Sequence, residues 1–250
     1  MHLCRADPWT GGLPEPRKEH ANLESPKASL AWDRQQHLQS LSERGFDLLV
    51  IGGGATGCSV ARDAALRGLD VCLVERGDLA CGTSSRSTRF IHGGLRYLKT
   101  LEFGFVREGL HERATLMGVA PHLVRPAEFL FPALRGGMPR FALRCGIGLY
   151  DLLAGKSRIP GTRSRSRSQS LLQEPCLRSE ALRGSVVYYD GAADDARLVN
   201  ETAISAVEAG ACVALHVEVE RVVPSESGPA VLVLRDRLTG ASLGARAGVV

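Results

Sequence analysis

The stretch at residues 46–57, FDLLVIGGGATG, decides the fold of this chain. Residues 48–51 are a short apolar run that ends directly in glycines, which is typical of a buried parallel strand. Residues 55–66 suit a helix that ends at Gly68, and residues 71–74 form a second apolar run. A strand, a helix and a strand within about 30 residues have the size of a βαβ unit. The stretch therefore predicts an α/β fold with a parallel sheet.

The glycines of this stretch predict a site for a dinucleotide. Gly52, Gly54 and Gly57 form the pattern GxGxxG between the strand and the helix. In such a loop the first glycine permits a tight turn, the second lets a pyrophosphate approach, and the third lets the helix pack closely. The anion then lies at a helix N-terminus, where free N–H groups and the helix dipole attract it. Glu75 ends the second strand, where its carboxylate can bind ribose hydroxyls and would repel a 2′-phosphate. Both NAD and FAD fit this pattern.

Length, charge and cysteine content exclude several classes of protein. A chain of 250 residues can form one large domain or two small ones. The formal net charge is only +4, from 31 basic and 27 acidic residues, which is too small to indicate nucleic-acid binding. The cysteines number 7 and no pair has CxxC spacing, so we expect reduced thiols and no metal site. No apolar run reaches about 18 residues, so no membrane-spanning helix is predicted.

The first part of the chain is predicted to be a tail. Residues 1–44 contain prolines at positions 8, 14, 16 and 26 that would break any long helix, although a short helix over residues 30–41 fits. We therefore expect a mostly irregular segment over residues 1–44 and a separate domain over residues 45–250.

The middle of the chain gives a weaker pattern. Apolar residues recur at helical spacing from Phe103 to Met117, which predicts a helix that ends near Gly118. Residues 126–155 are apolar without a clear period. Residues 156–170 are rich in arginine and serine and are predicted to form an exposed basic loop.

The last part of the chain again predicts alternating elements. A helix is expected to begin at Asp194, whose carboxylate would bond free amide groups, and to end at Gly210. Residues 213–219 alternate as in a strand, and residues 231–234 predict another. The final residues, 247–250, read as a strand that enters a core. We therefore expect the domain to be incomplete at its C-terminus and the chain to be the N-terminal part of a longer protein.

A long motif after the βαβ unit favours FAD over NAD as the bound dinucleotide. Residues 82–98 read GTSSRSTRFIHGGLRYL, and this segment resembles the FAD-dependent glycerol-3-phosphate dehydrogenases, the quinone-linked enzymes of bacterial membranes and mitochondria. The resemblance runs from about residue 45 to the end of the chain. Further segments that carry it are residues 46–57, 74–78, 111–114 (HERA), 120–123 (APHL), 149–152 (LYDL) and 194–198 (DDARL).

The resemblance implies an FAD-binding Rossmann-like parallel sheet with an antiparallel layer on the substrate side. It implies the oxidation of sn-glycerol 3-phosphate to dihydroxyacetone phosphate, with electrons passed to membrane quinone. The protein would then be cytoplasmic and peripheral to an inner membrane, either the bacterial cytoplasmic or the mitochondrial one, and we leave a homodimer open. The residues expected to bind FAD are Gly52, Gly53, Gly54, Thr56, Gly57, Glu75, Arg76, Thr83, Ser84, Ser85, Ser87, His92, Gly93 and Val219.

The same resemblance places Arg96 and Tyr97 toward the substrate, with His92 as a third catalytic candidate. An arginine can bind a phosphate dianion in bidentate fashion, which a lysine cannot. A tyrosine hydroxyl can hydrogen-bond a substrate oxygen, and the flavin accepts the hydride. For His92 we favour a histidine that supports the flavin over one that acts as the base.

Several alternatives stay open at this point. The chain could instead be an inactive FAD-binding fragment, or an FAD oxidoreductase for another small hydroxy or amino compound. Residues 129–153 combine aromatic residues with arginines, which fits either a membrane-surface helix or a buried helix with extended arginines. Arg163, Arg165 and Arg167 alternate with serines, and we favour a solvated loop over an RNA-binding or phosphorylated segment.

Overall fold

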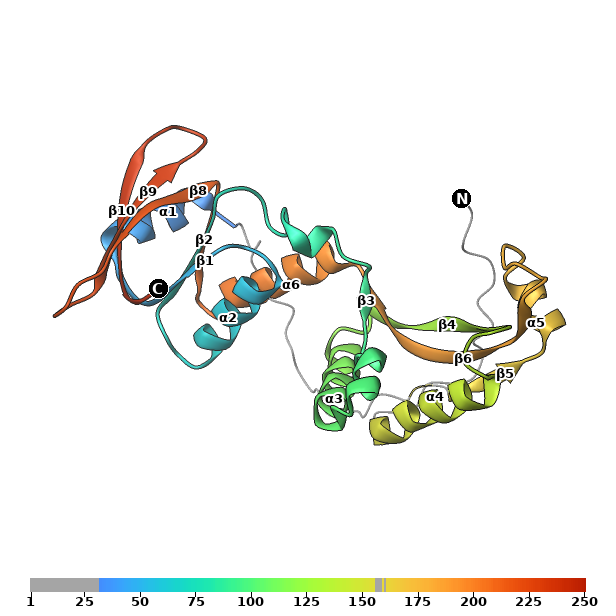
Figure 1. The fold of residues 1–250 in the computed structure, drawn as a ribbon. Coiled ribbons are helices and arrows are strands. Elements are labelled where there is room, and N and C mark those ends of the chain that lie inside the picture. Colours follow the sequence, from blue (N-terminus) through green and yellow to red (C-terminus); the bar gives the residue numbers. More distant parts are fainter. Residues whose placement is uncertain (1–31, 156–158, 160) are drawn as a thin grey trace, which may run out of the picture. The chain divides into compact units, whose positions relative to one another are not determined.

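The computed structural model describes residues 32–155, 159 and 161–250 (Figure 1). The chain divides into two compact units, Met1–Asp33 and Arg34–Val250. Helix α1 (Arg34–Glu43) overlaps the short helix expected over residues 30–41 of the tail, and it falls in the second unit. The irregular structure expected for residues 1–31 lies outside the described residues.

The glycine loop belongs to a sheet with the strand order β7-β2-β1-β10-β9-β8. The neighbours β7, β2, β1 and β10 run parallel, and β9 and β8 continue the sheet in antiparallel orientation. The expected parallel sheet is therefore confirmed. The strands are β1 (Gly45–Ile51), β2 (Val71–Glu75), β7 (Cys212–Leu215), β8 (Val217–Val223), β9 (Ala230–Asp236) and β10 (Ser242–Val249).

The predicted βαβ unit is confirmed as β1, α2 (Ala55–Leu66) and β2. Gly52 has a φ of +110°, which lets the chain turn sharply where β1 ends. Gly68 has a φ of +84° just after the end of α2, as expected for a residue that terminates a helix. All of β2 is buried, which agrees with its continuous apolar sequence.

Helix α1 packs against β7 and β10. Its apolar side contributes to the core of the sheet, and one of its charged residues forms an ion pair with the end of β9. Leu41 is fully buried in the same core cluster as Leu49. Arg34 donates to the Asp236 carboxylate at 2.6 Å and to the Leu215 carbonyl at 3.0 Å. The Arg34 guanidinium lowers the pKa of Asp236 to about 2. The stabilisation that this ion pair gives to α1 is therefore complete above the ordinary aspartate pKa of 3.8 and is lost as the pH falls from there through about 2.

A second, antiparallel sheet is built around the long strand β6. Strand β4 runs along one side of β6, while β3 and β5 pair with its other side at opposite ends. The antiparallel layer expected from the resemblance is therefore present. Its strands are β3 (Phe90–Ile91), β4 (Val124–Leu134), β5 (Arg163–Arg165) and β6 (Leu182–Ala193).

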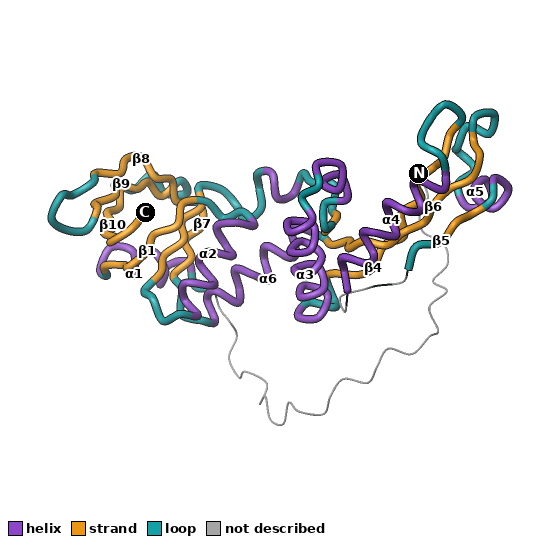
Figure 2. The backbone as a smooth tube through the Cα atoms, turned by 60° about the horizontal axis from the view of Figure 1, so that its bottom comes forward, coloured by secondary structure: helices purple, strands orange, loops and turns teal. Residues whose placement is uncertain are grey.

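The helices α3 (Phe103–Val119) and α4 (Arg140–Ala154) pack on each other and on this second sheet (Figure 2). The predicted end of α3 near Gly118 is confirmed. Helix α6 (Asp195–Glu208) follows β6 and packs beside α2. Its first turn is capped as expected, because the Asp194 carboxylate accepts from the Arg197 amide at 3.2 Å.

Two expectations about loops and strands are wrong. The basic loop expected at residues 156–170 contains β5 and the start of α5 (Arg167–Gln173). Strand β5 forms because it pairs with β6, which is distant in the sequence, and α5 begins where Ser166 and Gln169 form a capping box. The single strand expected at residues 213–219 is interrupted at His216, which has a φ of +57°. The chain therefore changes from parallel β7 to antiparallel β8, and Val219 lies inside β8 instead of ending a strand.

Candidate functional site

The glycine loop is shaped so that the backbone of β1 and the start of α2 nearly touch. A Cβ at position 57 would lie 2.0 Å from the Gly52 carbonyl oxygen, so no larger residue fits there. A Cβ at position 53 would lie 2.8 Å from a Leu79 methyl group. These short distances explain why positions 53 and 57 of the loop are glycines.

The N-terminus of α2 presents the amide groups that an anion would need. The Ala55 amide donates to the Ser84 hydroxyl at 3.0 Å, and a Cβ at position 54 would lie 3.1 Å from the same oxygen. Ser84 lies in the short 3-10 helix η1 (Thr83–Ser85) and is half-buried. The neutral Ser84 hydroxyl oxygen thus accepts a hydrogen bond from the N-terminus of α2, at the place where the glycine pattern predicts an oxygen of the pyrophosphate. The residues present therefore fit the diphosphate of a dinucleotide.

Glu75 links the end of β2 to the glycine loop. Its side chain is buried, and its carboxylate accepts from the Gly53 amide at 2.7 Å and from the Gly77 amide at 2.8 Å. The carboxylate therefore lies beside the loop, as the sequence predicts for a ribose-binding acid. It also fixes the backbone on both sides of itself, a role that the sequence did not indicate.

The segment with the sequence HGGLRYL forms a turn and the 3-10 helix η2 (Leu95–Thr100). Gly94 has a φ of +72°, and its amide donates to His92 Nδ1 at 3.1 Å. Because Nδ1 accepts this bond, the neutral His92 ring carries its proton on Nε2 and is a hydrogen-bond donor there. Arg96 is exposed, and its guanidinium donates to the Tyr97 hydroxyl at 2.7 Å.

A pocket of about 320 Å³ opens beside this turn. Its walls come from the turn, from η2 and from three strands of the second sheet. Phe129 packs against Phe90 with ring centroids 4.7 Å apart and stacks on Tyr188 at 5.3 Å, so one wall is aromatic. The lining residues are Thr88, Phe90, His92, Gly94, Leu95, Arg96, Phe129, Tyr188 and Asp190.

The pocket brings together two of the expected catalytic residues, His92 and Arg96. Tyr97 does not line the pocket itself but contacts two residues that do, Arg96 and Gly94, while its ring packs in an apolar cluster with Leu110. The pocket also contains residues that sequence reasoning missed, above all Asp190. The two consecutive tyrosines before Asp190 in β6 were the available signal, and the pairing of β6 with β4 brings them to the site.

The other expected cofactor residues lie around the glycine loop, in the turn after His92 or inside the sheet. Thr56 is exposed at the start of α2, and Arg76 is exposed with its carbonyl accepting from Arg237. Ser85 donates to the Gly82 carbonyl at 3.3 Å, and Ser87 bonds the Asp195 carboxylate. The remaining members are Thr83, which begins η1, Gly93, which is buried in the turn, and Val219, which is half-buried in β8.

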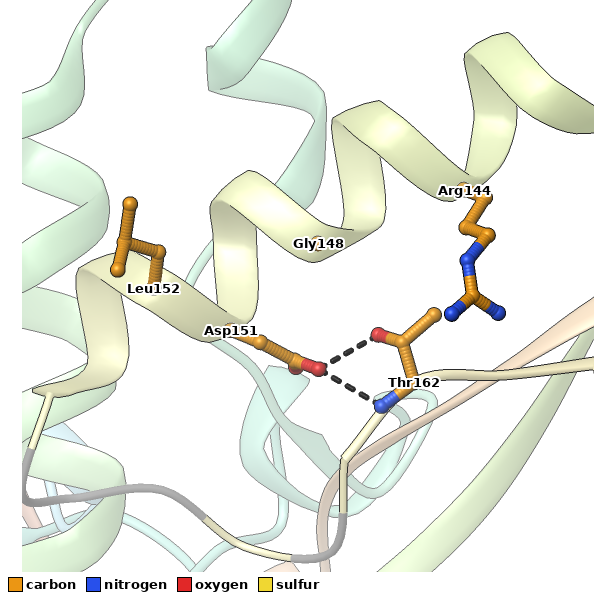
Figure 3. A pocket seen from close by; sticks show the side chains of 5 residues that line it. All are labelled: Arg144, Gly148, Asp151, Leu152 and Thr162. Carbon is orange, nitrogen blue, oxygen red and sulfur yellow. Dashed lines mark hydrogen bonds between the residues drawn. The ribbon is translucent and has the colours of Figure 1, made fainter.

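A second pocket of about 240 Å³ lies between α4 and the segment before β5 (Figure 3). The Asp151 carboxylate accepts from the Thr162 amide at 2.7 Å and from its hydroxyl at 2.6 Å. Arg144 extends toward Thr162 in the same view and donates to the Ser164 hydroxyl at 3.2 Å. These contacts hold the chain before β5 on α4, and the pocket contains none of the expected site residues.

The geometry of the site defines a class of protein. A glycine loop at a helix N-terminus, a buried acid at the end of β2 and a pocket on an adjoining antiparallel sheet are the parts of a dinucleotide-binding protein with a separate ligand site. The sequence model of the family described as FAD dependent oxidoreductase matches residues 47–250. The chain belongs to this family, and its cofactor is FAD.

Curated relatives and solved structures support the more specific resemblance. The chain is 46% identical to glycerol-3-phosphate dehydrogenase 2 of Mycobacterium bovis over 200 residues, which is 80% of this chain and 33% of the relative. It is 45% identical to the mitochondrial glycerol-3-phosphate dehydrogenase of Homo sapiens, over 73% of this chain and 26% of the relative. The X-ray structure of the Bacillus halodurans glycerol-3-phosphate dehydrogenase complexed with FAD superposes with a TM-score of 0.66 at 32% identity, covering 86% of this chain and 36% of that chain. The chain thus spans about a third of the length of the first of these relatives.

Proposed function

We propose that this protein oxidises sn-glycerol 3-phosphate to dihydroxyacetone phosphate through FAD and passes the electrons to a membrane quinone. The observation that carries the proposal is the pocket beside the His92 turn, which combines a guanidinium with donor groups in a chain of this family. The names of the curated relatives support the choice of substrate. When FAD is bound, its isoalloxazine ring supplies the hydride acceptor.

The residues of the pocket have distinct tasks in this proposal. Arg96 binds the phosphate dianion, because its planar guanidinium can donate two parallel hydrogen bonds to phosphate oxygens. Tyr97 accepts a hydrogen bond from Arg96 and so holds the guanidinium in place. His92 donates from Nε2 toward the substrate or the cofactor, since its Nδ1 is already bonded to the Gly94 amide. The aromatic wall around Phe129 gives the pocket one apolar side.

We expect Arg96→Ala to raise the KM for glycerol 3-phosphate by about one to two orders of magnitude, the usual worth of hydrogen bonds to a charged group. Arg96→Lys should recover only part of this loss, because an ammonium group cannot bind phosphate in bidentate fashion. Dye reduction by the FAD-loaded protein, followed against substrate concentration, measures the effect. Arg107→Ala, at an exposed arginine of α3 outside the pocket, is the matched control. Undiminished activity of Arg96→Ala would remove Arg96 from the substrate site.

The membrane part of the proposal rests on helix α4. One side of α4 is buried through Leu143 and Ile147, whereas Phe141 is 77% exposed and Leu152 is 75% exposed. Arginines lie beside these apolar residues on α4 and in β5, as on a helix that docks on anionic lipid. Among the described residues, no helix is both long enough and apolar enough to cross a bilayer. We therefore infer that α4 contacts the membrane surface from which quinone is reached.

Co-sedimentation with anionic vesicles tests this inference. We expect the double variant Phe141→Ser with Leu152→Ser to bind such vesicles at least about tenfold more weakly than the parent, because two large apolar side chains no longer enter the lipid. Leu172→Ser is the matched control, since Leu172 is 86% exposed but lies on α5. Equal binding by the parent, the double variant and the control would contradict the assignment of α4.

A further inference from the structure

A buried chain of hydrogen bonds contacts the turn that contains His92. The Gly93 amide donates to the Tyr150 hydroxyl at 2.7 Å, and that hydroxyl donates to Asp190 Oδ2 at 2.9 Å. Arg113 Nη1 donates to Asp190 Oδ1 at 2.8 Å. Tyr150, Asp190 and Arg113 come from α4, β6 and α3, respectively, and all are buried. Three separate elements are therefore linked, through the Tyr150 hydroxyl, to one backbone amide of the turn.

Each of these buried hydrogen bonds has a fixed direction. A backbone amide can only donate, so the Tyr150 oxygen accepts from Gly93 and its proton points to Asp190. Burial and the neighbouring Asp190 carboxylate raise the pKa of the Tyr150 hydroxyl well above its ordinary value, so the hydroxyl keeps this proton. The Arg113 guanidinium holds the Asp190 carboxylate from its other oxygen. The Tyr150 hydroxyl thus has one orientation.

The turn is also held by close packing on α3. A Cβ at position 93 would lie 2.5 Å from Leu110 Cγ and 2.8 Å from the Tyr150 oxygen. A Cβ at position 109 would lie 3.1 Å from the Gly93 Cα atom. The backbone of the turn therefore rests directly on α3, with the Tyr150 hydroxyl as its polar contact.

The same turn carries the polar groups of the pocket. His92, Gly94 and Arg96 line it from the turn and η2, and Asp190 lines it from β6. A shift of the Gly93 amide would move His92 and Arg96 with it, since they are one and three residues away along the chain. Displacements of about 1 Å at such groups can lower the rate of a reaction by up to about 100-fold.

We propose that Tyr150 is a positioning residue: its hydroxyl, oriented by Asp190 and Arg113, sets the place of the His92-Gly93-Gly94 turn and thereby the pocket groups. This inference rests on the proposed function in taking the pocket as the substrate site. The hydrogen-bond chain itself does not depend on the identity of the substrate.

Tyr150→Phe tests the proposal because it removes the hydroxyl and keeps the ring. Tyr189→Phe is the matched control, since its hydroxyl donates to Glu128 at 2.6 Å and Tyr189 does not line the pocket. We first measure amide hydrogen exchange at Gly93 by NMR on the 250-residue chain without added cofactor. The Gly93 amide should exchange at least about tenfold faster in Tyr150→Phe and as in the parent in Tyr189→Phe. Unchanged exchange in Tyr150→Phe would overturn the proposal.

The second measurement uses the FAD-loaded protein and glycerol 3-phosphate. In Tyr150→Phe we expect kcat/KM to fall by at least about tenfold, with most of the loss in kcat, because the groups are still present but displaced. A hydroxyl with only a structural role would lower the melting temperature and leave kcat/KM of the folded protein unchanged, which would overturn the proposal. If the parent itself does not oxidise glycerol 3-phosphate, the proposed function fails, and Gly93 exchange still decides the role of Tyr150.

Discussion

Replacing Gly57 with alanine is expected both to lower the free energy of unfolding and to weaken FAD binding strongly. The new methyl carbon would lie 2.0 Å from the Gly52 carbonyl oxygen and 3.4 Å from a Val50 methyl group. Both the oxygen and the start of α2 are backbone, so the clash is relieved only if α2 moves away from β1. Overpacking of this kind costs about 1–3 kcal/mol or more. The displaced helix would also take its N-terminal amides away from the pyrophosphate, and we expect FAD affinity to fall by at least about 100-fold.

Two other glycines of the same region supply graded controls for Gly57→Ala. A Cβ at position 45 would meet nothing within 4 Å, so Gly45→Ala should leave stability and FAD binding unchanged. A Cβ at position 54 would lie 3.1 Å from the Ser84 hydroxyl, which can rotate away, so Gly54→Ala should weaken FAD binding while changing stability little. Urea unfolding followed by circular dichroism and titration with FAD measure the two effects. Normal stability of Gly57→Ala would contradict the steric argument, whatever its FAD affinity.

The second large effect is expected at the ion pair between Arg113 and Asp190. Both side chains are only 2% exposed, and their contact measures 2.8 Å. Burial raises the pKa of Asp190, while the bonds from Arg113 act in the opposite direction and favour the carboxylate. Asp190→Asn keeps an acceptor for Tyr150 but leaves the Arg113 charge buried without its counter-ion. Breaking a buried pair in this way costs about 3–5 kcal/mol in the free energy of unfolding.

An exposed pair in the same chain is the control for Asp190→Asn. Arg67 contacts Asp63 at 2.7 Å, but the two side chains are 71% and 65% exposed, so Arg67→Ala should leave the unfolding midpoint unchanged. The double variant Arg113→Met with Asp190→Leu should recover part of the stability that Asp190→Asn loses, because no unpaired charge remains. Chemical denaturation of the variants measures all three effects. A loss below about 1 kcal/mol for Asp190→Asn would mean that water reaches the pair.

The parts of the fold that the sequence predicted well are those whose contacts are local. The glycine loop, α2 and Gly68 follow one another within a short stretch, and each position has a steric or capping reason that nearby residues reveal. The same is true of α6, where Asp194 caps the first turn and Gly210 follows the end. In such segments, helix periodicity and turn chemistry act over few residues and can be recognised without knowing the rest of the chain.

The antiparallel layer was expected only from the resemblance, and its strands could not be located from their own residues because they depend on partners far away in the sequence. β4 contains Pro126 and Pro132, which hide its strand character, and it becomes ordered by pairing along β6. A separate pairing with β6 makes Arg163–Arg165 strand β5 instead of a loop. The register of these pairings decides which residues share a face, and it is not encoded in any single segment.

By itself, therefore, the sequence determined the dinucleotide loop and, through residues 82–98, the resemblance to an FAD-dependent dehydrogenase. Only the tertiary structure decided which side chains share the pocket with His92 and Arg96. Phe90, Phe129 and Asp190 come from three strands, and they meet because β6 pairs with both β3 and β4. The physical reason is the range of the interactions: turns and caps are set by neighbours in sequence, whereas a pocket on a sheet is set by long-range pairing and burial.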